Sequence, residues 1–324
     1  MNVRWCFRVR GVRLGRVNRR DSLLAALVAT VWGFNFVVID WGMGEVPPLL
    51  FLTARFVLVV LPAVFWIPRP QAPWRVVAAI GVFMSLGQFG FLYVGMAAGM
   101  PPGLAALVLQ AQVIFTILIA AGVLHERPTA GQVAGVLLGS VGLLVVAVGR
   151  GGDVPLLALA LTVLAALTWG VGNVLSRASG ISGGLSLTVW SALVVPVPLL
   201  ALSLLLDGPA AVGDGLAAFG WEALLSTVYT AGLASLVGYG IFNTLLGRNP
   251  SASVVPWVLL APVVAMASAA LLLDQWPNGA ESLGGLLLVL GVLVAVRPPR
   301  RARVPAVAAT EPGLRPARTA PAEC

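Results

Sequence analysis

The sequence has few charged residues, no lysine, a single histidine and two cysteines. Charged residues make up 10% of the 324 positions, hydrophobic residues make up 59%, and the mean hydropathy is +0.97. A soluble domain covers its water-facing surface with charge, so this composition excludes a soluble protein. The chain is therefore predicted to have the lipid bilayer as its main solvent.

The shortage of histidine, cysteine and clustered carboxylates excludes most catalytic and metal chemistry. His125 stands beside Glu126 in a loop, and no other group of such residues has the spacing of metal ligands or of a nucleophile and its base. No phosphate-binding loop of the P-loop type is present. Cys6 and Cys324 stand in the terminal segments, where no structural disulfide is expected. The sequence thus predicts no enzyme, no catalytic residue, no metal site and no cofactor.

Hydrophobic runs long enough to cross a bilayer, about 20 residues each, recur along the chain. We expect about ten of them, all helical, because backbone polar groups exposed to lipid must be satisfied within their own segment. The predicted fold class is an all-α membrane protein with ten transmembrane helices. The predicted spans are 22–43, 48–67, 75–98, 102–123, 130–149, 155–176, 185–206, 222–246, 251–273 and 280–296.

The 20 basic residues are all arginines, and they collect in every second loop. If the N-terminus lies in the cytoplasm, 18 of them fall inside, only Arg150 falls outside, and Arg55 lies within a span. This positive-inside pattern predicts that both termini are cytoplasmic. Residues 1–21 are interpreted as a basic cytoplasmic tail rather than a cleaved signal, and residues 297–324 as a disordered cytoplasmic tail. Topology and anionic lipid headgroups explain the arginine excess, so no nucleic-acid partner is expected.

An internal repeat divides the chain into two halves of five spans, predicted at 22–149 and 155–296. Because five is odd, the halves must cross the membrane in opposite directions, which gives the inverted five-helix repeats of many secondary transporters. A shift of 149 residues places Pro101, Pro128, Gly135 and Gly142 on Pro250, Pro277, Gly284 and Gly291.

The fifth span of each half is predicted to begin in the same way. Thr129 with Gln132, and Asn278 with Glu281, have the spacing of a capping box directly after a proline. In the first half a ridge of small residues follows, which lets another helix approach closely; its members are Gly131, Gly135 and Gly139.

Stretches between residues 22 and 296 carry a family resemblance. They are VWGFNFVVID at 31–40, PPLLFLTARF at 47–56, MPPGLAALVLQAQVIFT at 100–116, HERPTAGQVAG at 125–135, VWSAL at 189–193, VGYGIFNTLLGR at 237–248 and LLLDQ at 271–275. In these stretches the chain resembles the drug/metabolite transporter superfamily in its ten-span form with two EamA-type halves, and within it the bacterial exporters of O-acetylserine and cysteine. One departure is that the family usually has Glu and a basic residue after the ninth span, where this chain has Gln275 and Trp276.

The resemblance implies a secondary transporter of the bacterial inner (cytoplasmic) membrane that exports small polar metabolites by alternating access at a midplane cavity. Cysteine, O-acetylserine or related amino acids are the expected substrates. The expected partners are this small molecule and membrane lipid, and a homodimer stays open. The alternatives are a broad-specificity drug or metabolite efflux protein and, less favoured, a non-transporting membrane scaffold. The absence of membrane-embedded carboxylates away from the span ends counts against a cation site.

A zwitterionic substrate needs a donor for its carboxylate, an acceptor for its ammonium group and apolar walls. Arg55 is the only charge near mid-span, so it must face protein or a water-filled cavity. Two interpretations stay open: Arg55 holds the carboxylate, or it has a structural role, in which it braces helices by binding backbone carbonyls or snorkels to the interface.

Neutral polar and aromatic residues complete the predicted substrate site. Trp32 and Asn35 share one face of the first span, as Trp169 and Asn173 do on the sixth, and each face could close over a ligand or form interhelical hydrogen bonds. The candidate substrate-binding residues are Trp32, Asn35, Arg55, Gln88, Gln110, Gln112, Trp169, Asn173, Tyr229, Tyr239, Asn243 and Trp257. Of these, Gln110 and Gln112 point about 200° apart, so at most one lines a given cavity.

Overall fold

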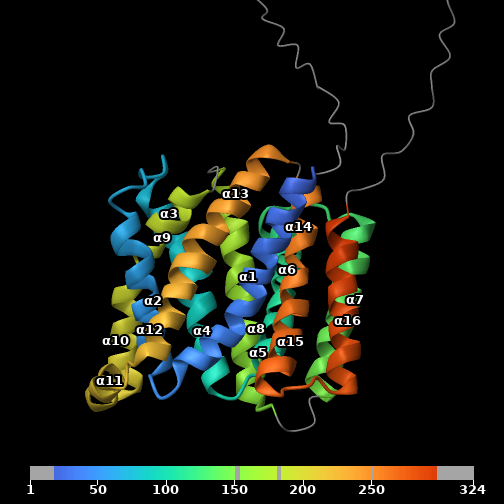
Figure 1. Cartoon of the computed structure of the whole chain (residues 1–324). Coiled ribbons are helices and arrows are strands. Elements are labelled where there is room, and N and C mark those ends of the chain that lie inside the picture. The colour runs from blue at the N-terminus through green and yellow to red at the C-terminus, as the bar shows by residue number, and fades with distance from the viewer. Residues whose placement is uncertain (1–17, 150–153, 181–183, 250, 298–324) are drawn as a thin grey trace, which may run out of the picture.

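The structure is a computed structural model that describes residues 18–149, 154–180, 184–249 and 251–297. All regular elements in these segments are helices, and they stand side by side in one bundle (Figure 1). Most of the two predicted tails, together with Cys6, Cys324 and Arg150, lie outside the described residues.

Several membrane-crossing stretches consist of more than one helical element, and we number these stretches as spans 1 to 10 in chain order. Spans 1 to 5 are α1 (Arg19–Met43); α2 (Pro48–Ala63); α3 (Trp74–Gly81) with the π-helix η1 (Val82–Gly87) and α4 (Gln88–Ala97); α5 (Pro102–Val108) with the 3-10 helix η2 (Leu109–Ala111) and α6 (Gln112–Val123); and α7 (Ala130–Gly149). Spans 6 to 10 are α8 (Leu156–Ala178); α9 (Leu185–Ala192) with α10 (Pro196–Leu206); α12 (Trp221–Val228) with the π-helix η3 (Tyr229–Val237) and α13 (Gly238–Arg248); α14 (Ser251–Val258) with α15 (Leu260–Leu273); and α16 (Gly279–Val296).

Nine of these spans are long and apolar enough to cross a bilayer, counted over the residues that the structure describes. Span 2 is an apolar helix of 16 residues. At 1.5 Å per residue it is about 24 Å long, which covers most of a hydrocarbon core of about 30 Å. The predicted all-helical, ten-span fold class is confirmed.

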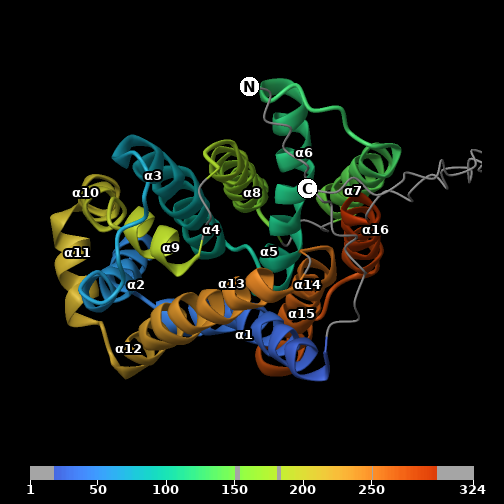
Figure 2. The ribbon, with the colours of Figure 1, turned by 90° about the horizontal axis from the view of Figure 1, so that it is seen from above.

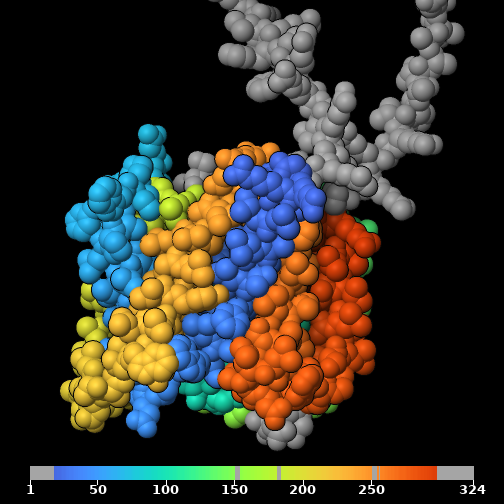
Figure 3. Space-filling view, in the orientation of Figure 1, coloured from blue at the N-terminus to red at the C-terminus, as the bar shows by residue number. Residues whose placement is uncertain are grey.

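The two ends of the bundle are distinguished by the chain termini. α1 begins and α16 ends on the same side, which we call the terminal face, while α7 ends and α8 begins on the opposite face (Figure 1). Seen from above the terminal face, α7 and α16 stand together at one edge of the bundle and α10 and α11 at another (Figure 2). Along its length α1 lies between span 8 and α15 (Figure 3).

Irregular helix geometry recurs at equivalent places in the two halves. Spans 3 and 8, the third of each half, both contain a π-helix. Spans 4 and 9, the fourth of each half, are both interrupted, at Leu109–Ala111 and at Leu259. Because α7 begins at the terminal face and α16 at the opposite face, the two halves cross the membrane in opposite directions (Figure 1). The predicted inverted repeat is therefore visible in the helices themselves.

Both predicted capping boxes form. The Gln132 backbone N–H donates to Thr129 Oγ1 at 3.2 Å, and the Thr129 N–H donates to Gln132 Oε1 at 2.8 Å. The corresponding distances for Asn278 and Glu281 are 2.8 and 3.0 Å. These bonds satisfy N–H groups that the first turn of a helix leaves without a partner, and so they fix where α7 and α16 begin.

Glycines bring α7 and α16 into direct contact. A Cβ atom on Gly142 would lie 2.6 Å from the Gly284 carbonyl oxygen, and one on Gly284 would lie 2.6 Å from the Gly142 carbonyl oxygen. Gly135 faces Gly291 in the same way, about two helical turns from Gly142 along the seam. The ridge of small residues predicted in α7 thus packs against its repeat-related helix, and any larger side chain would force the two helices apart.

Two local features differ from the prediction. A helix of 10 residues, α11 (Gly208–Ala217), lies on the opposite face where a loop was expected. It is too short to cross the bilayer, and it packs Gly215 against Pro47 at the start of α2. Span 2 ends at Ala63 instead of residue 67, and Phe65 and Trp66 beyond it are exposed, because the prolines that follow disfavour helical geometry in the residues before them.

We expect Gly142→Leu to destabilise the protein by about 1 to 3 kcal/mol or to abolish folding, because the side chain would overpack the α7–α16 seam. Gly122→Ala is the matched control, since nothing lies within 4 Å of a Cβ at that helical position. Thermal unfolding of the purified variants in detergent measures the difference. Equal midpoints for the two variants would mean that the seam does not depend on glycine.

Candidate functional site

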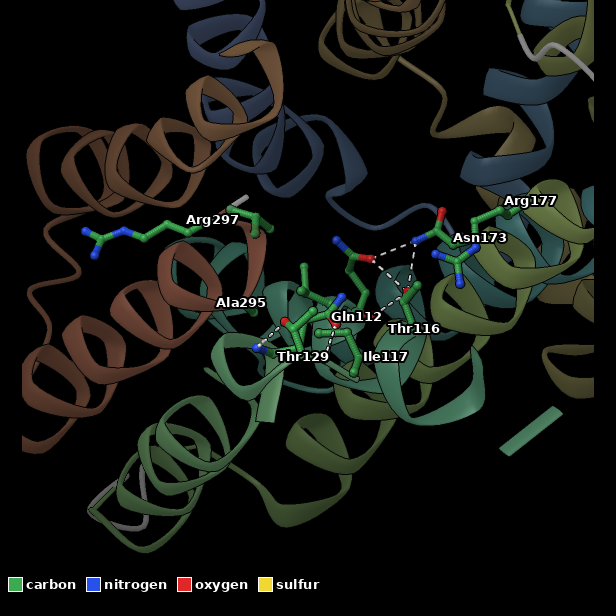
Figure 4. Close-up of a pocket in the computed structure, with 11 residues that line it drawn as sticks. Gln112, Thr116, Ile117, Thr129, Asn173, Arg177, Ala295 and Arg297 are labelled. Atoms are coloured by element: carbon green, nitrogen blue, oxygen red, sulfur yellow. Dashed lines mark hydrogen bonds between the residues drawn. The ribbon is translucent and has the colours of Figure 1, made fainter. Parts of the chain in front are cut away.

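A cavity opens on the terminal face. Its volume is about 440 Å³, which lies within the range of small-molecule sites in proteins. It lies between α6 and α8, and the start of α7 and the end of α16 close its far side (Figure 4). The lining residues are Gln112, Val113, Thr116, Ile117, Thr129, Gln132, Asn173, Arg177, Ala295, Val296 and Arg297.

A hydrogen-bonded polar cluster forms the inner wall of this cavity. The Asn173 side-chain amide donates to Gln112 Oε1 at 2.7 Å and to Thr116 Oγ1 at 3.3 Å, as Figure 4 shows. The Thr116 hydroxyl itself donates to the Gln112 backbone carbonyl at 2.7 Å. All three side chains are half-buried, so they present both donors and acceptors to a ligand in the cavity.

The mouth of the cavity carries positive charge. Arg177 and Arg297 extend from opposite sides of the opening (Figure 4). Arg177 Nη2 forms an ion pair with Glu126 Oε2 at 2.6 Å, and about half of each side chain is exposed. An exposed pair of this kind contributes at most about 1 kcal/mol, so it can break and re-form as a ligand enters.

A smaller cavity of about 170 Å³ lies on the opposite face, between α5, α15 and the residues before α16. Its lining includes Asn278 and Glu281, which are the repeat equivalents of Thr129 and Gln132 in the larger cavity. The inverted repeat thus produces one cavity at each face beside the α7–α16 seam. Their unequal sizes give the bundle an asymmetry that alternating access requires.

Arg55 lies outside both cavities, in an aromatic and hydroxyl cage at the core of the bundle. Only 4% of the residue is exposed. Its Nη1 donates to Tyr93 Oη at 3.0 Å, its Nη2 donates to Ser235 Oγ at 3.1 Å, and its Cζ lies 4.2 Å from the Phe89 ring centroid. Arg55 thus faces protein, which is one of the two surroundings expected for it, and it binds side-chain hydroxyls rather than backbone carbonyls.

Trp32 joins span 1 to span 8. Its indole N–H donates to the Ala234 carbonyl at 2.9 Å, and its ring lies 5.0 Å from the Tyr239 ring and 5.2 Å from the Phe242 ring between centroids. Gly238 stands directly beneath the indole, where a Cβ would lie 2.7 Å from Trp32 Nε1. This aromatic group fixes the crossing of the two spans near the π-helix η3.

Similarity to known proteins shows which family the chain belongs to. The profile of the EamA-like transporter family matches residues 21–148 and 156–297. The chain belongs to the EamA-like transporter family.

Curated relatives of this EamA-family protein include exporters. It is 42% identical over 286 residues to a probable amino-acid metabolite efflux pump of Escherichia coli K12, covering 86% of this chain and 96% of the relative. It is 41% identical over 297 residues to a probable amino-acid metabolite efflux pump of Salmonella typhimurium, covering 89% and 99%. A probable terminal-alkyne amino-acid exporter of Streptantibioticus cattleyicolor is 28% identical over 285 residues, covering 84% and 92%.

Solved structures support the fold of the EamA-family protein. One crystal structure aligns with a TM-score of 0.56 at 22% identity and covers 87% of this chain and 96% of its own. Taken together, the family and the relatives identify a multi-pass membrane transporter with an exporter's role, and not an enzyme.

The predicted substrate-binding residues of this EamA-family protein are distributed over two regions. Gln112 and Asn173 line the terminal-face cavity, and Gln110 is buried away from it, as their angular separation predicted. The other candidates lie in the bundle rather than in that cavity. Asn35 and Gln88 are buried, Tyr229 donates to the Val31 carbonyl at 2.9 Å, and Trp169, Tyr239, Asn243 and Trp257 are half-buried.

Sequence reasoning missed several polar residues that the structure brings to these regions. Thr116 follows Gln112 by four positions and so shares its helix face, a spacing that could have found it. Tyr93 and Ser235 bind Arg55 from other spans, 38 and 180 residues away, and no local pattern marks them.

We expect a cysteine at Thr116 to react with a water-soluble maleimide in nanodiscs, in a chain whose two native cysteines are replaced by serine. The cavity supplies the water that a reactive thiolate needs. Leu118→Cys is the control, because Leu118 is 53% exposed on the lipid-facing surface of the same helix. Labelling should be at least about 10-fold slower there, since lipid suppresses the thiolate. Equal rates would mean that the cavity does not reach Thr116.

Proposed function

We propose that the protein exports small amino-acid metabolites, cysteine and O-acetylserine first among them, across the bacterial inner membrane by alternating access. The observation that carries this proposal is the pair of repeat-related cavities on opposite faces, one large and one small, beside a glycine-packed seam. The relatives at 42% and 41% identity are named probable amino-acid metabolite efflux pumps, which supports the substrate class.

The polar wall of the larger cavity fits such a substrate. The wall consists of amide and hydroxyl groups that hydrogen-bond to one another, from Gln112, Thr116 and Asn173. These uncharged groups can accept hydrogen bonds from an ammonium group or donate hydrogen bonds to a carboxylate. The arginines at the mouth attract the carboxylate end first. A substrate held by neutral groups can also leave again, which a transporter requires.

A broad exporter of cationic compounds has less support. Among the described residues, the carboxylates of the spans stand at or near span ends, as Asp21 does at the start of α1 and Asp40 near its end. The mouth of the larger cavity carries Arg177 and Arg297. A cation would meet repulsion at the mouth and no counter-charge inside.

The terminal face is proposed to be cytoplasmic, because the arginine-rich loops and both chain ends belong to that side. In intact cells, Gly213→Cys in α11 should then react with an impermeant maleimide added outside. The site is suitable because Gly213 is exposed and nothing lies within 4 Å of a Cβ there. Thr116→Cys should stay unlabelled in intact cells and react in inside-out vesicles. The reverse pattern would invert the topology and turn the larger cavity outward.

Transport is expected not to require a proton gradient. A proton-coupled carrier needs a titratable group on the pathway, and Asp40 is three residues from the end of α1, about 5 Å of rise from the opposite face. In proteoliposomes, efflux of labelled L-cysteine should persist without a pH gradient and change less than about 2-fold in Asp40→Asn. A strict requirement for an imposed gradient, lost in Asp40→Asn, would instead make Asp40 the coupling site.

A further inference from the structure

Some buried polar side-chain atoms in the described part of the chain have no hydrogen-bond partner. They are Asn35 Oδ1, Arg55 Nε and Thr227 Oγ1, in residues that are 7%, 4% and 4% exposed. Buried polar groups in native proteins are nearly always paired, since each orphan keeps its desolvation penalty without a compensating bond. These atoms are therefore candidates for contact with something other than the protein.

The orphaned atoms are not scattered through the bundle. They belong to α1, α2 and α12, and α12 packs against both α1 and α2. Asn35 is eight residues before the end of α1, Arg55 seven residues after the start of α2, and Thr227 six residues after the start of α12. At 1.5 Å of rise per residue, all of them lie about 9 to 12 Å from the opposite face. We call these three residues, which lie at similar depths in spans 1, 2 and 8, the polar layer.

Asn35 faces span 8 within this layer. The Ser226 hydroxyl donates to the Val38 carbonyl at 2.7 Å, and the Tyr229 hydroxyl donates to the Val31 carbonyl at 2.9 Å. Gly42, two turns beyond Asn35 on the same helix face, packs directly against Ser226. Asn35 thus lies between contacts that hold α1 against α12, the helix that carries Thr227.

A ladder of hydrogen bonds along span 8, made by hydroxyls and backbone carbonyls, connects Arg55 to the Thr227 carbonyl. Its Nη2 donates to Ser235 Oγ at 3.1 Å, Ser235 Oγ donates to the Thr230 carbonyl at 2.7 Å, and Thr230 Oγ1 donates to the Thr227 carbonyl at 3.2 Å. The ladder runs along the π-helix η3 (Tyr229–Val237). Such wide turns occur often at functional sites, where they can shift register.

The charge of Arg55 is not neutralised by the described residues. The ion pair found among them joins Arg177 to Glu126, while the partners of Arg55 are the hydroxyls of Tyr93 and Ser235. A buried charge without a counter-charge is strongly unfavourable, so the guanidinium favours an anionic ligand. Its free Nε–H is the donor left for that ligand.

We propose that Arg55, Asn35 and Thr227 form a second substrate position, specific for a molecule that carries both a carboxylate and an ammonium group. Arg55 Nε–H donates to the carboxylate, Asn35 Oδ1 accepts from the ammonium group, and the Thr227 hydroxyl bonds to either end. This proposal rests on the proposed export of amino acids, and it adds a structural basis for the choice of substrate. The position lies nearer the opposite face than the terminal face, so substrate reaches it when spans 1, 2 and 8 separate.

The test measures binding of L-cysteine to the purified full chain in nanodiscs under reducing conditions. Cysteamine lacks the carboxylate and 3-mercaptopropionate lacks the amino group, so each should bind at least about 10-fold more weakly than L-cysteine. Thr227→Val and Asn35→Leu should raise the Kd for L-cysteine about 10- to 100-fold. Both variants should keep or raise the melting temperature, because each removes an orphaned polar atom.

Matched controls separate this site from general effects of lost polarity or charge. Thr244→Val removes an exposed hydroxyl that bonds within its own helix, and Arg75→Gln removes an exposed arginine; neither should change the Kd. Unchanged affinity in Thr227→Val and Asn35→Leu would show that water alone satisfies these atoms and would overturn the site. If those variants transport normally while wild type exports amino acids, only this inference fails. If wild type neither binds nor exports any amino acid, the proposed function fails as well.

Discussion

The structure depends on one constraint: a backbone inside lipid must satisfy its own hydrogen bonds. Every span is helical for this reason, and departures from α-helical geometry occur only within the bundle. Most occur in pairs, as π-helices in spans 3 and 8 and as interruptions in spans 4 and 9, while the break between α9 and α10 in span 7 has no counterpart in the continuous α2. Each pair follows from the inverted repeat, so the two halves place their irregular backbone at equivalent depths from opposite faces.

The glycine seam joins α7 and α16 into a pair of closely packed helices. The other spans face this pair. Backbone contacts at Gly142 and Gly284 leave no room for sliding without collision. Both cavities adjoin this seam, one at the start of α7 and the other at the start of α16. The remaining walls are lined by α6 and α8 in the larger cavity and by α5 and α15 in the smaller one.

Much of the fold could be predicted from the sequence because its signals are local. Hydrophobic runs, the arginine distribution and two capping boxes depend on neighbouring residues, and so does the glycine ridge. The capping residues before α7 and α16, Thr129 and Asn278, were predicted correctly. By contrast, α11 was missed because its glycines and proline resemble a loop, and packing against Pro47 stabilises it instead.

The candidate sites could be predicted only in part, because they are made of contacts between distant spans. Gln112 and Asn173 were proposed as cavity residues from their polarity and their positions on predicted helices, but the bond between them joins positions 61 residues apart. Arg55 was recognised as a buried charge, whereas its partners Tyr93 and Ser235 were not. Thr227 could not be distinguished from other hydroxyls, since what marks it is a missing partner in the folded bundle.

Counterflow in proteoliposomes tests most directly whether the protein is a carrier with alternating access. Vesicles loaded with unlabelled L-cysteine are diluted into a trace of labelled L-cysteine, with no ion gradient and no membrane potential. A carrier that exposes its site to one face at a time exchanges the two pools, so the label should rise transiently above its equilibrium level inside and then decline. Label that only approaches equilibrium, or never enters, would contradict the account.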